Sequence, residues 1–166
     1  MAKLSVNINK IATLRNARGE NIPDLINSAI DIINFGADGI TVHPRPDERH
    51  IKYSDVIELS NILKKEFNIE GNPNDKFMNL VKDVKPTQVT LVPDSINAIT
   101  SSSGWDTKEN FSFLKDTVEE LKSHSIRTSV FVDPNLEMIE YAKKLSADRI
   151  ELFTGKYAEL FSKDKE

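Results

Sequence analysis

Three side chains with acid or base chemistry stand at or near the ends of short apolar segments. His43 follows one such segment, Glu70 ends a second, and Glu151 lies within a third. Histidine exchanges protons near neutral pH, and a carboxyl group held in a protein can act as a general base or acid. Barrel enzymes take their catalytic groups from the carboxyl ends of parallel strands. The pattern therefore predicts a barrel enzyme with these three residues as its catalytic groups.

His43 and Glu151 each have a structural as well as a catalytic interpretation. His43 could cap a strand without taking part in chemistry. Glu151 is flanked by Ile150 and Leu152, and alternation along a strand makes it point away from both. If those two residues pack against helices, Glu151 points into the barrel, where it must bind a ligand, pair or titrate with a raised pKa. A buried ion pair with lysine or arginine is its structural alternative.

Two segments carry the basic side chains that a site for phosphate or carboxylate groups needs. The segment with Arg15 and Arg18 follows the first apolar segment directly, and we expect a polar, phosphate-binding loop there. Residues 44–50 combine two stiffening prolines with Arg45 and His50, whose donors suit anionic oxygens. A cluster of solvated charges is the alternative for this second segment.

Smaller polar groups could orient a substrate beside these cations. Asn7 and Asn9 are expected on one face of the first strand, where amides can hold a carbonyl or hydroxyl group. Lys10 is adjacent and could contact phosphate or form a Schiff base with a carbonyl substrate. Thr100 begins a stretch rich in serine that could cradle an oxyanion or could be an ordinary loop.

The composition limits the classes of ligand and partner. A net charge of −4 and a pI near 5.5 argue against general nucleic-acid binding, so basic groups are expected to act locally. The chain has no cysteine, its three histidines are not at metal-ligand spacing, and we predict no metal site. No signal peptide, membrane span, Walker loop or dinucleotide fingerprint is found in the sequence. We expect a cytoplasmic protein without a membrane partner.

Apolar segments alternate with amphipathic ones along the whole chain. This is the pattern of a parallel sheet whose crossover connections are helices. The expected strands are residues 4–8, 38–43, 67–70, 87–92, 127–132 and 148–153. The expected helices lie between them, over about 23–36, 54–63, 75–84, 111–121 and 136–145, the second with Ser54 as its N-cap.

The sequence contains fewer strand–helix units than the eight of a full barrel. Six strand–helix units in 166 residues require about 28 residues each, so eight units would need about 220. We therefore predict an α/β protein in which residues 1–166 form a single domain with about six units of a TIM (β/α)8 barrel. The polar residues 158–166 could be a frayed tail or the start of a helix, and truncation at the C-terminus is the favoured interpretation.

Five motifs, taken in order, resemble those of the pyridoxine 5′-phosphate synthase family. They are residues 7–18 (NINKIATLRNAR), 36–43 (GADGITVH), 49–51 (RHI), 68–70 (NIE) and 91–93 (LVP). The resemblance covers nearly the whole chain. It implies a cofactor-free transferase of vitamin B6 biosynthesis that condenses 1-deoxy-D-xylulose 5-phosphate with 3-amino-2-oxopropyl phosphate. The implied products are pyridoxine 5′-phosphate, inorganic phosphate and water, and the implied assembly is a homo-oligomer, an octamer in the family.

The resemblance also implies roles for individual residues. His43 and Glu70 correspond to the family's acid and base residues, and Glu151 corresponds to a further active-site carboxylate. The residues that would contact the ketose phosphate are Arg45, His50 and Thr100. Those that would contact the amino-ketone phosphate are Asn7 and Arg18, with Asn9 and Lys10 beside them.

Two departures from the family pattern bear on activity. Many members have Asp-His where this chain has Asn9-Lys10, and we expect substrate positioning to survive because lysine can still contact phosphate. The family's third catalytic residue, a histidine on the seventh strand, has no counterpart within the 166 residues, so we expect no turnover from this chain alone. The alternatives to an enzyme are a truncated, non-catalytic barrel fragment that binds phosphorylated ligands or partner subunits, and an open α/β nucleotide binder.

Overall fold

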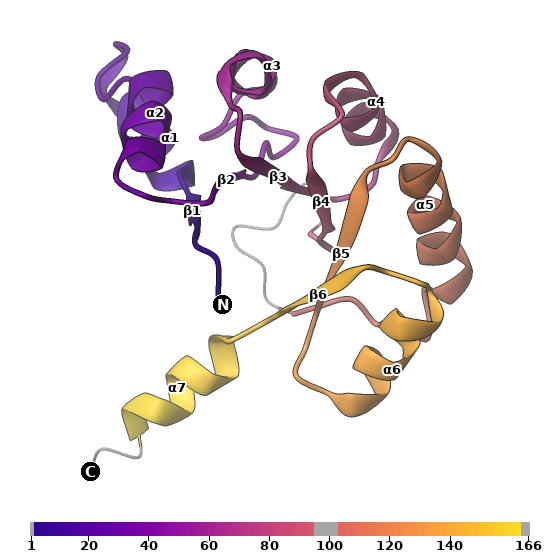
Figure 1. The fold of residues 1–166 in the computed structure, drawn as a ribbon. Coiled ribbons are helices and arrows are strands. Elements are labelled where there is room, and N and C mark those ends of the chain that lie inside the picture. Colours follow the sequence, from indigo (N-terminus) through magenta and orange to yellow (C-terminus); the bar gives the residue numbers. More distant parts are fainter. Residues whose placement is uncertain (1, 95–102, 164–166) are drawn as a thin grey trace.

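Six parallel strands form a single curled sheet in the computed structural model, which describes residues 2–94 and 103–163. Each strand pairs with the next one in the chain, so the order is the order of the sequence (Figure 1). The strands are β1 (Ser5–Asn7), β2 (Gly39–Val42), β3 (Glu66–Gly71), β4 (Gln88–Leu91), β5 (Arg127–Val132) and β6 (Arg149–Leu152).

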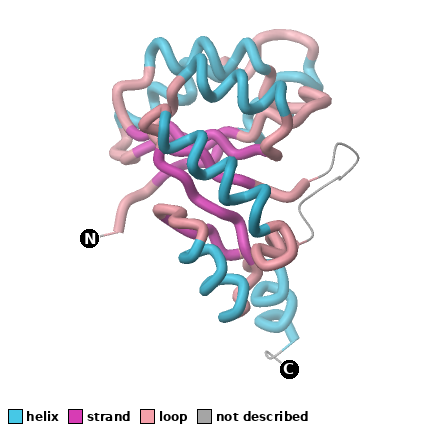
Figure 2. The backbone as a smooth tube through the Cα atoms, turned by 90° about the vertical axis from the view of Figure 1, so that its right-hand side faces the viewer, coloured by secondary structure: helices cyan, strands magenta, loops and turns pink. Residues whose placement is uncertain are grey.

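Helices cover the convex face of the sheet (Figures 1 and 2). The helices are α1 (Asn9–Arg18), α2 (Leu25–Asn34), α3 (Tyr53–Ile62), α4 (Asp75–Val84), α5 (Phe111–Ser123), α6 (Leu136–Lys144) and α7 (Gly155–Lys163). The last of them, α7, extends away from the sheet (Figure 1). This alternation of strands and helices around a curled parallel sheet is that of a partial (β/α) barrel, as predicted.

The core lies between the sheet and the helices on its convex face. Every residue of β2 and β4 is buried, which is typical of parallel strands that are covered on both faces. Apolar stripes of the helices complete this layer, with Leu59 of α3, Phe77 of α4 and Leu121 of α5 among the fully buried side chains. This core therefore holds the strands, and with them the residues at their carboxyl ends, in place.

Most of the predicted elements are confirmed within a few residues. Helix α4 has the expected bounds, and Gly36 follows α2 with φ of 108°, as expected for a residue that ends a helix in the left-handed region. The predicted Ser54 N-cap is wrong, because α3 begins at Tyr53 and the Asp55 carboxylate accepts the Lys52 backbone N–H at 2.8 Å. The tail is helical over α7.

The polar loop expected after the first strand is wrong, because residues 9–18 form helix α1. Strand β1 is correspondingly shorter than predicted and ends at Asn7. Helix α1 buries Ala12 and Arg15 and leaves most of its other side chains exposed or half-buried. An arginine on the buried face hides the apolar periodicity that would have identified the helix.

Candidate active site

His43 and Glu70 meet at the carboxyl edge of the sheet. His43 follows β2 directly and Glu70 is the last residue but one of β3, so the parallel pairing of these neighbours brings the two side chains together. His43 Nδ1 lies 3.9 Å from Glu70 Oε2, close enough for an ion pair but too long for a hydrogen bond. Both side chains are largely buried.

The two groups have pKa values shifted in opposite directions. The pKa of His43 is lowered to about 4, mainly by burial and also by the Arg45 and His50 charges, while the Asp94 charge opposes this shift. The pKa of Glu70 is raised to about 8, mainly by burial and also by the carboxylates of Glu151 and Asp94. At neutral pH the proton of this pair therefore resides on Glu70 while the imidazole is neutral. One member can donate a proton and the other can accept one.

Glu151 acts on Glu70 from β6, at the opposite end of the sheet order from β1. The pKa of Glu151 is raised by burial, and its negative charge contributes to the raised pKa of Glu70. Among the described residues no ion pair is found for Glu151, so the structural alternative of a buried salt bridge is not supported. The premise that its neighbours pack against helices is wrong, since Ile150 is 37% exposed and Leu152 is 46% exposed.

Arg45 and Asp94 form a second charged pair at the same edge. Arg45 Nη1 lies 3.3 Å from Asp94 Oδ2, and both side chains are buried. The charges of both residues reach His43, and the Asp94 charge also reaches Glu70. Arg45 is therefore not part of a solvated charge cluster. Asp94 was not foreseen from the sequence, although it follows the Leu-Val-Pro motif at the end of β4 and a carboxylate there could have been suspected.

Two asparagines connect the end of β1 to His43. Asn7 Oδ1 accepts the Asn9 backbone N–H at 2.9 Å, and Asn9 Oδ1 accepts the His43 backbone N–H at 2.8 Å. The expectation that both lie on one strand face is wrong, because Asn9 begins α1. The Asn9 side chain thus holds the backbone at His43.

His50 lies beside His43, with ring centroids 6.4 Å apart in an edge-on arrangement. His50 Nδ1 accepts the Ile51 backbone N–H at 3.0 Å, so the neutral ring carries its proton on Nε2. Burial lowers the pKa of His50, and the charges of Arg45, Arg49 and Lys10 add to this effect against Asp47. In the described part of the chain no hydrogen bond is found for Nε2–H, and a donor of this kind suits a bond to a phosphate or hydroxyl oxygen.

The other residues that were predicted to bind anions lie in different environments. Lys10 is exposed, and its charge lowers the pKa of His50. Arg15 is not available as a phosphate clamp, because both of its Nη atoms lie 2.8 Å from the carboxylate of Asp55. Arg18 ends α1, about 14 Å along the helix axis from Asn9, and is exposed. Thr100 lies outside the described residues.

Metal-binding clusters and membrane-spanning helices are absent from residues 2–94 and 103–163. No cluster of histidine, cysteine, aspartate or glutamate there could hold a metal ion. No helix in the same ranges is long and apolar enough to cross a membrane. A cavity of about 570 Å³ is bordered by Arg15, Asn16 and Asp55, and neither His43 nor Glu70 is part of its lining.

Comparison with known proteins gives matches along the whole chain. A family model described as pyridoxal phosphate biosynthesis protein PdxJ matches residues 4–166. Pyridoxine 5′-phosphate synthase of Bacteroides fragilis is 62% identical over 164 residues, which cover 99% of this chain and 69% of that protein. The enzyme of the same name from Flavobacterium johnsoniae is 63% identical over 158 residues, covering 95% and 67%.

Solved structures resemble the fold at low sequence identity. Phosphoribosylanthranilate isomerase of Thermotoga maritima superimposes with a TM-score of 0.56 and 14% identity, over 92% of this chain and 64% of that one. At this identity the likeness concerns the fold alone. The match to the family model and the identity of about 60% to its relatives concern the sequence itself. The chain therefore belongs to the PdxJ family, whose members matched here are pyridoxine 5′-phosphate synthases.

Proposed function

We propose that His43, Glu70 and Glu151 carry the acid and base steps of pyridoxine 5′-phosphate synthase, the transferase activity of the family to which this chain belongs. The 3.9 Å approach of His43 Nδ1 to Glu70 Oε2, with opposite pKa shifts, is the observation that supports this assignment most directly. Ring closure from two carbonyl compounds needs repeated proton transfers. A neutral base beside a protonated acid is prepared to supply both kinds of transfer.

The direction of the first transfers follows from the resting protonation states. Neutral His43 accepts a proton from the carbon or nitrogen that becomes the nucleophile, and protonated Glu70 gives one to the oxygen that leaves as water. Glu151, which raises the pKa of Glu70, keeps that proton available at neutral pH. No resident cofactor or metal is needed for these steps.

The substrates that we propose are 1-deoxy-D-xylulose 5-phosphate and 3-amino-2-oxopropyl phosphate, both of which carry a phosphate group. Arg45 and His50, together with Thr100, are proposed to contact the ketose phosphate. The groups proposed for the amino-ketone are Asn7 and Arg18, with Asn9 and Lys10 beside them. Buried Arg45 provides a fixed cation, and the exposed cations can be reached from solvent.

The family assignment and the sheet order also bear on the domain organisation, location and assembly of the protein. We propose that the chain forms one barrel domain, acts in the cytoplasm, and assembles as a homo-oligomer. The family assignment supports the use of phosphorylated small molecules. The continuous order of the sheet supports one domain, since each strand pairs with its neighbour in sequence.

Product formation from the two phosphorylated substrates tests the proposed function. In protein expressed from its complete reading frame, His43→Ala and Glu70→Gln should each lower kcat by about 10²–10⁴-fold while the melting curve shows a folded protein. Glu120→Gln, which removes only a surface ion pair with Lys82, is the matched control and should leave kcat unchanged. Near-normal turnover in His43→Ala or Glu70→Gln would remove that residue from the mechanism.

A further inference from the structure

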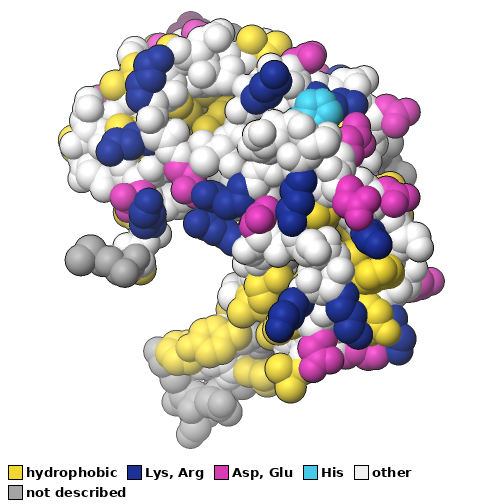
Figure 3. All heavy atoms as spheres, turned by 45° about the vertical axis from the view of Figure 1, so that its right-hand side comes forward, with side chains coloured by type: hydrophobic (Ala, Val, Ile, Leu, Met, Phe, Trp, Pro, Cys, Tyr) yellow, Lys and Arg dark blue, Asp and Glu magenta, His cyan; other side chains and the backbone are white. Residues whose placement is uncertain are grey.

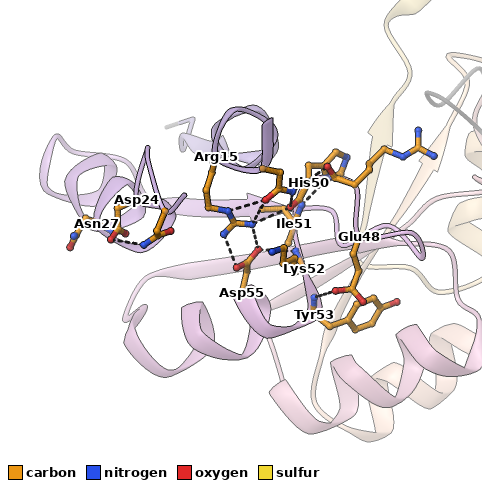
Figure 4. A network of polar contacts seen from close by, with 12 residues as sticks. Arg15, Asp24, Asn27, Glu48, His50, Ile51, Lys52, Tyr53 and Asp55 are labelled. Carbon is orange, nitrogen blue, oxygen red and sulfur yellow. Dashed lines mark hydrogen bonds and ion pairs between the residues drawn. The ribbon is translucent and has the colours of Figure 1, made fainter. Parts of the chain in front are cut away.

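A buried ion pair outside the acid and base groups connects helix α1 to the start of helix α3. Arg15 Nη1 and Nη2 each lie 2.8 Å from one carboxylate oxygen of Asp55, and both residues are 7% exposed. Figure 4 shows Arg15 pointing from α1 toward Asp55. A buried ion pair contributes little net stability because both groups lose their hydration, so its presence calls for a reason other than stability.

The same guanidinium group reaches the segment that carries His50. Arg15 Nη2 donates to the His50 carbonyl oxygen at 3.3 Å. Asn16, the next residue of α1, accepts from Arg15 Nε at 3.1 Å and donates from Nδ2 to the His50 carbonyl oxygen at 2.8 Å. Asn16 Nδ2 also lies 3.2 Å from the Arg49 carbonyl oxygen. Two consecutive residues of α1 therefore hold one carbonyl group from two directions.

Asp55 holds the other side of this segment. Its Oδ2 atom accepts the Lys52 backbone N–H at 2.8 Å while it pairs with Arg15. Between these fixed points, the Ile51 N–H donates to His50 Nδ1 at 3.0 Å and sets the ring (Figure 4). The backbone on both sides of His50 and the ring itself are thus constrained by hydrogen bonds.

We propose that Arg15, Asn16 and Asp55 are positioning residues that hold the His50 ring, with its Nε2–H donor, at the carboxyl edge of the sheet for contact with the phosphorylated ketose. This inference rests on the proposed function, in which His50 contacts that substrate. The three residues touch neither His43 nor Glu70 in the contacts described above. They act on substrate binding through the placement of His50.

Loss of this network has a signature in the free protein. Burial lowers the pKa of the His50 ring, the charges of Arg45, Arg49 and Lys10 lower it as well, and the carboxylate of Asp47 raises it. A ring released from its backbone support becomes more hydrated, and its pKa moves up toward the ordinary value of about 6.5. The chain has three histidines, so NMR titration of the imidazole signals can follow His50 individually.

The first experiment uses Asn16→Ala, which removes the amide donors to the His50 carbonyl without creating a charge. We expect a higher pKa of His50 in the free protein and a KM for the ketose phosphate raised by about 5–10-fold, the scale of a lost hydrogen bond. The KM of the amino-ketone and kcat should change by less than about twofold, because the lost interaction is one of substrate binding.

Asp55→Asn provides a second variant that keeps the shape of the side chain and weakens the pair with Arg15. It should change the His50 titration and the ketose KM in the same direction as Asn16→Ala. Asp148→Asn is the matched control, because Asp148 accepts a backbone N–H from Thr128 at 2.9 Å at the opposite, amino edge of the sheet. It should leave both readouts unchanged.

The outcomes separate this inference from the proposed function. An unchanged His50 titration and an unchanged ketose KM in folded Asn16→Ala and Asp55→Asn would overturn the positioning role. A rise in both KM values together with a loss of kcat would also overturn it, since that pattern indicates general damage to the site. If the unaltered protein formed no product, the proposed function would fail, and the His50 titration would still decide whether α1 holds the ring.

Discussion

The 3.9 Å approach of His43 to Glu70 makes a specific prediction for the pH dependence of the free enzyme. Activity requires neutral His43, so kcat/KM should rise as the pH increases through about 4. It also requires protonated Glu70, so kcat/KM should fall as the pH increases through about 8. A pH series of kcat/KM measures both limbs. A basic limb that persists unchanged in Glu70→Gln would assign it to a different group.

Glu151→Gln tests the source of the raised pKa of Glu70. The substitution removes a negative charge that raises this pKa, so the basic limb should move to lower pH. Glu151 is not among the causes of the His43 shift, and the acidic limb should therefore stay in place as an internal control. A basic limb that does not move would show that burial and Asp94 suffice to raise the pKa of Glu70.

Residue type and position were easier to predict from the sequence than the pairing of one side chain with another. His43 and Glu70 were named from residue type and position at strand ends, and Arg45 from its basic, proline-stiffened segment; the structure brings all three to one edge. Asp94 and the use of Arg15 were missed. Both errors concern pairing: the Arg15–Asp55 contact joins residues 40 positions apart, and no local spacing indicates which carboxylate a given arginine meets.

At the scale of elements, helix α1 shows where sequence patterns fail. Strands and amphipathic helices were predicted because apolar residues recur at regular spacing. In α1 the buried positions are taken by Ala12 and Arg15, one small and one charged, so the buried face has no apolar stripe. The guanidinium charge of Arg15 can be buried because the Asp55 carboxylate on α3 pairs with it. The tertiary partner, rather than local preference, decides the structure of this segment.

Gly71 at the end of β3 tests how the strand and the following helix fit together next to Glu70. A Cβ atom on Gly71 would overlap the buried ring of Phe77 in α4. Gly71→Ala should therefore lower the free energy of unfolding by about 1–3 kcal/mol, the usual cost of overpacking. It should also shift the basic limb of the pH profile, because the neighbouring Glu70 must move. Urea unfolding and the pH series measure the two effects.

Gly36→Ala is the control for that experiment. A Cβ on Gly36 meets no atom within 4 Å, and the residue has a φ of 108°, so this substitution costs stability through backbone strain alone. It should leave the basic limb unchanged. Equal shifts of that limb in both variants would mean that lower stability, rather than local packing at Glu70, changes the site.

For the whole molecule, the order of the sheet predicts how its stability is distributed. Strands β2 to β5 each have two neighbours, whereas β1 and β6 are the edge strands of the described sheet. Amide hydrogen exchange should be slowest in β3 and β4 and faster in β1 and β6, which are short and mostly exposed. Uniform protection across all six strands would contradict this prediction.

The C-terminal part of the described chain has exposed hydrophobic side chains. Hydrophobic side chains gather beside the C-terminal part of the molecule (Figure 3), and α7 leaves Tyr157, Leu160 and Phe161 exposed. Ile150 and Leu152 of β6 are 37% and 46% exposed, and α7 extends away from the sheet (Figure 1). Alternation along a strand indicates which residues share a face, but it does not indicate what covers that face.

One residue, Ile8, separates the end of β1 from the start of α1, and this short connection makes the region intolerant of changes in chain length. An insertion after Ile8 would turn every side chain of α1 by about 100° about the helix axis. Arg15 would then face away from Asp55 and Lys10 away from His50, although no functional residue had been altered. The connection between α1 and α2 is six residues long and could absorb the same insertion. Between β1 and α2, natural variation in chain length should therefore be confined to the connection between α1 and α2.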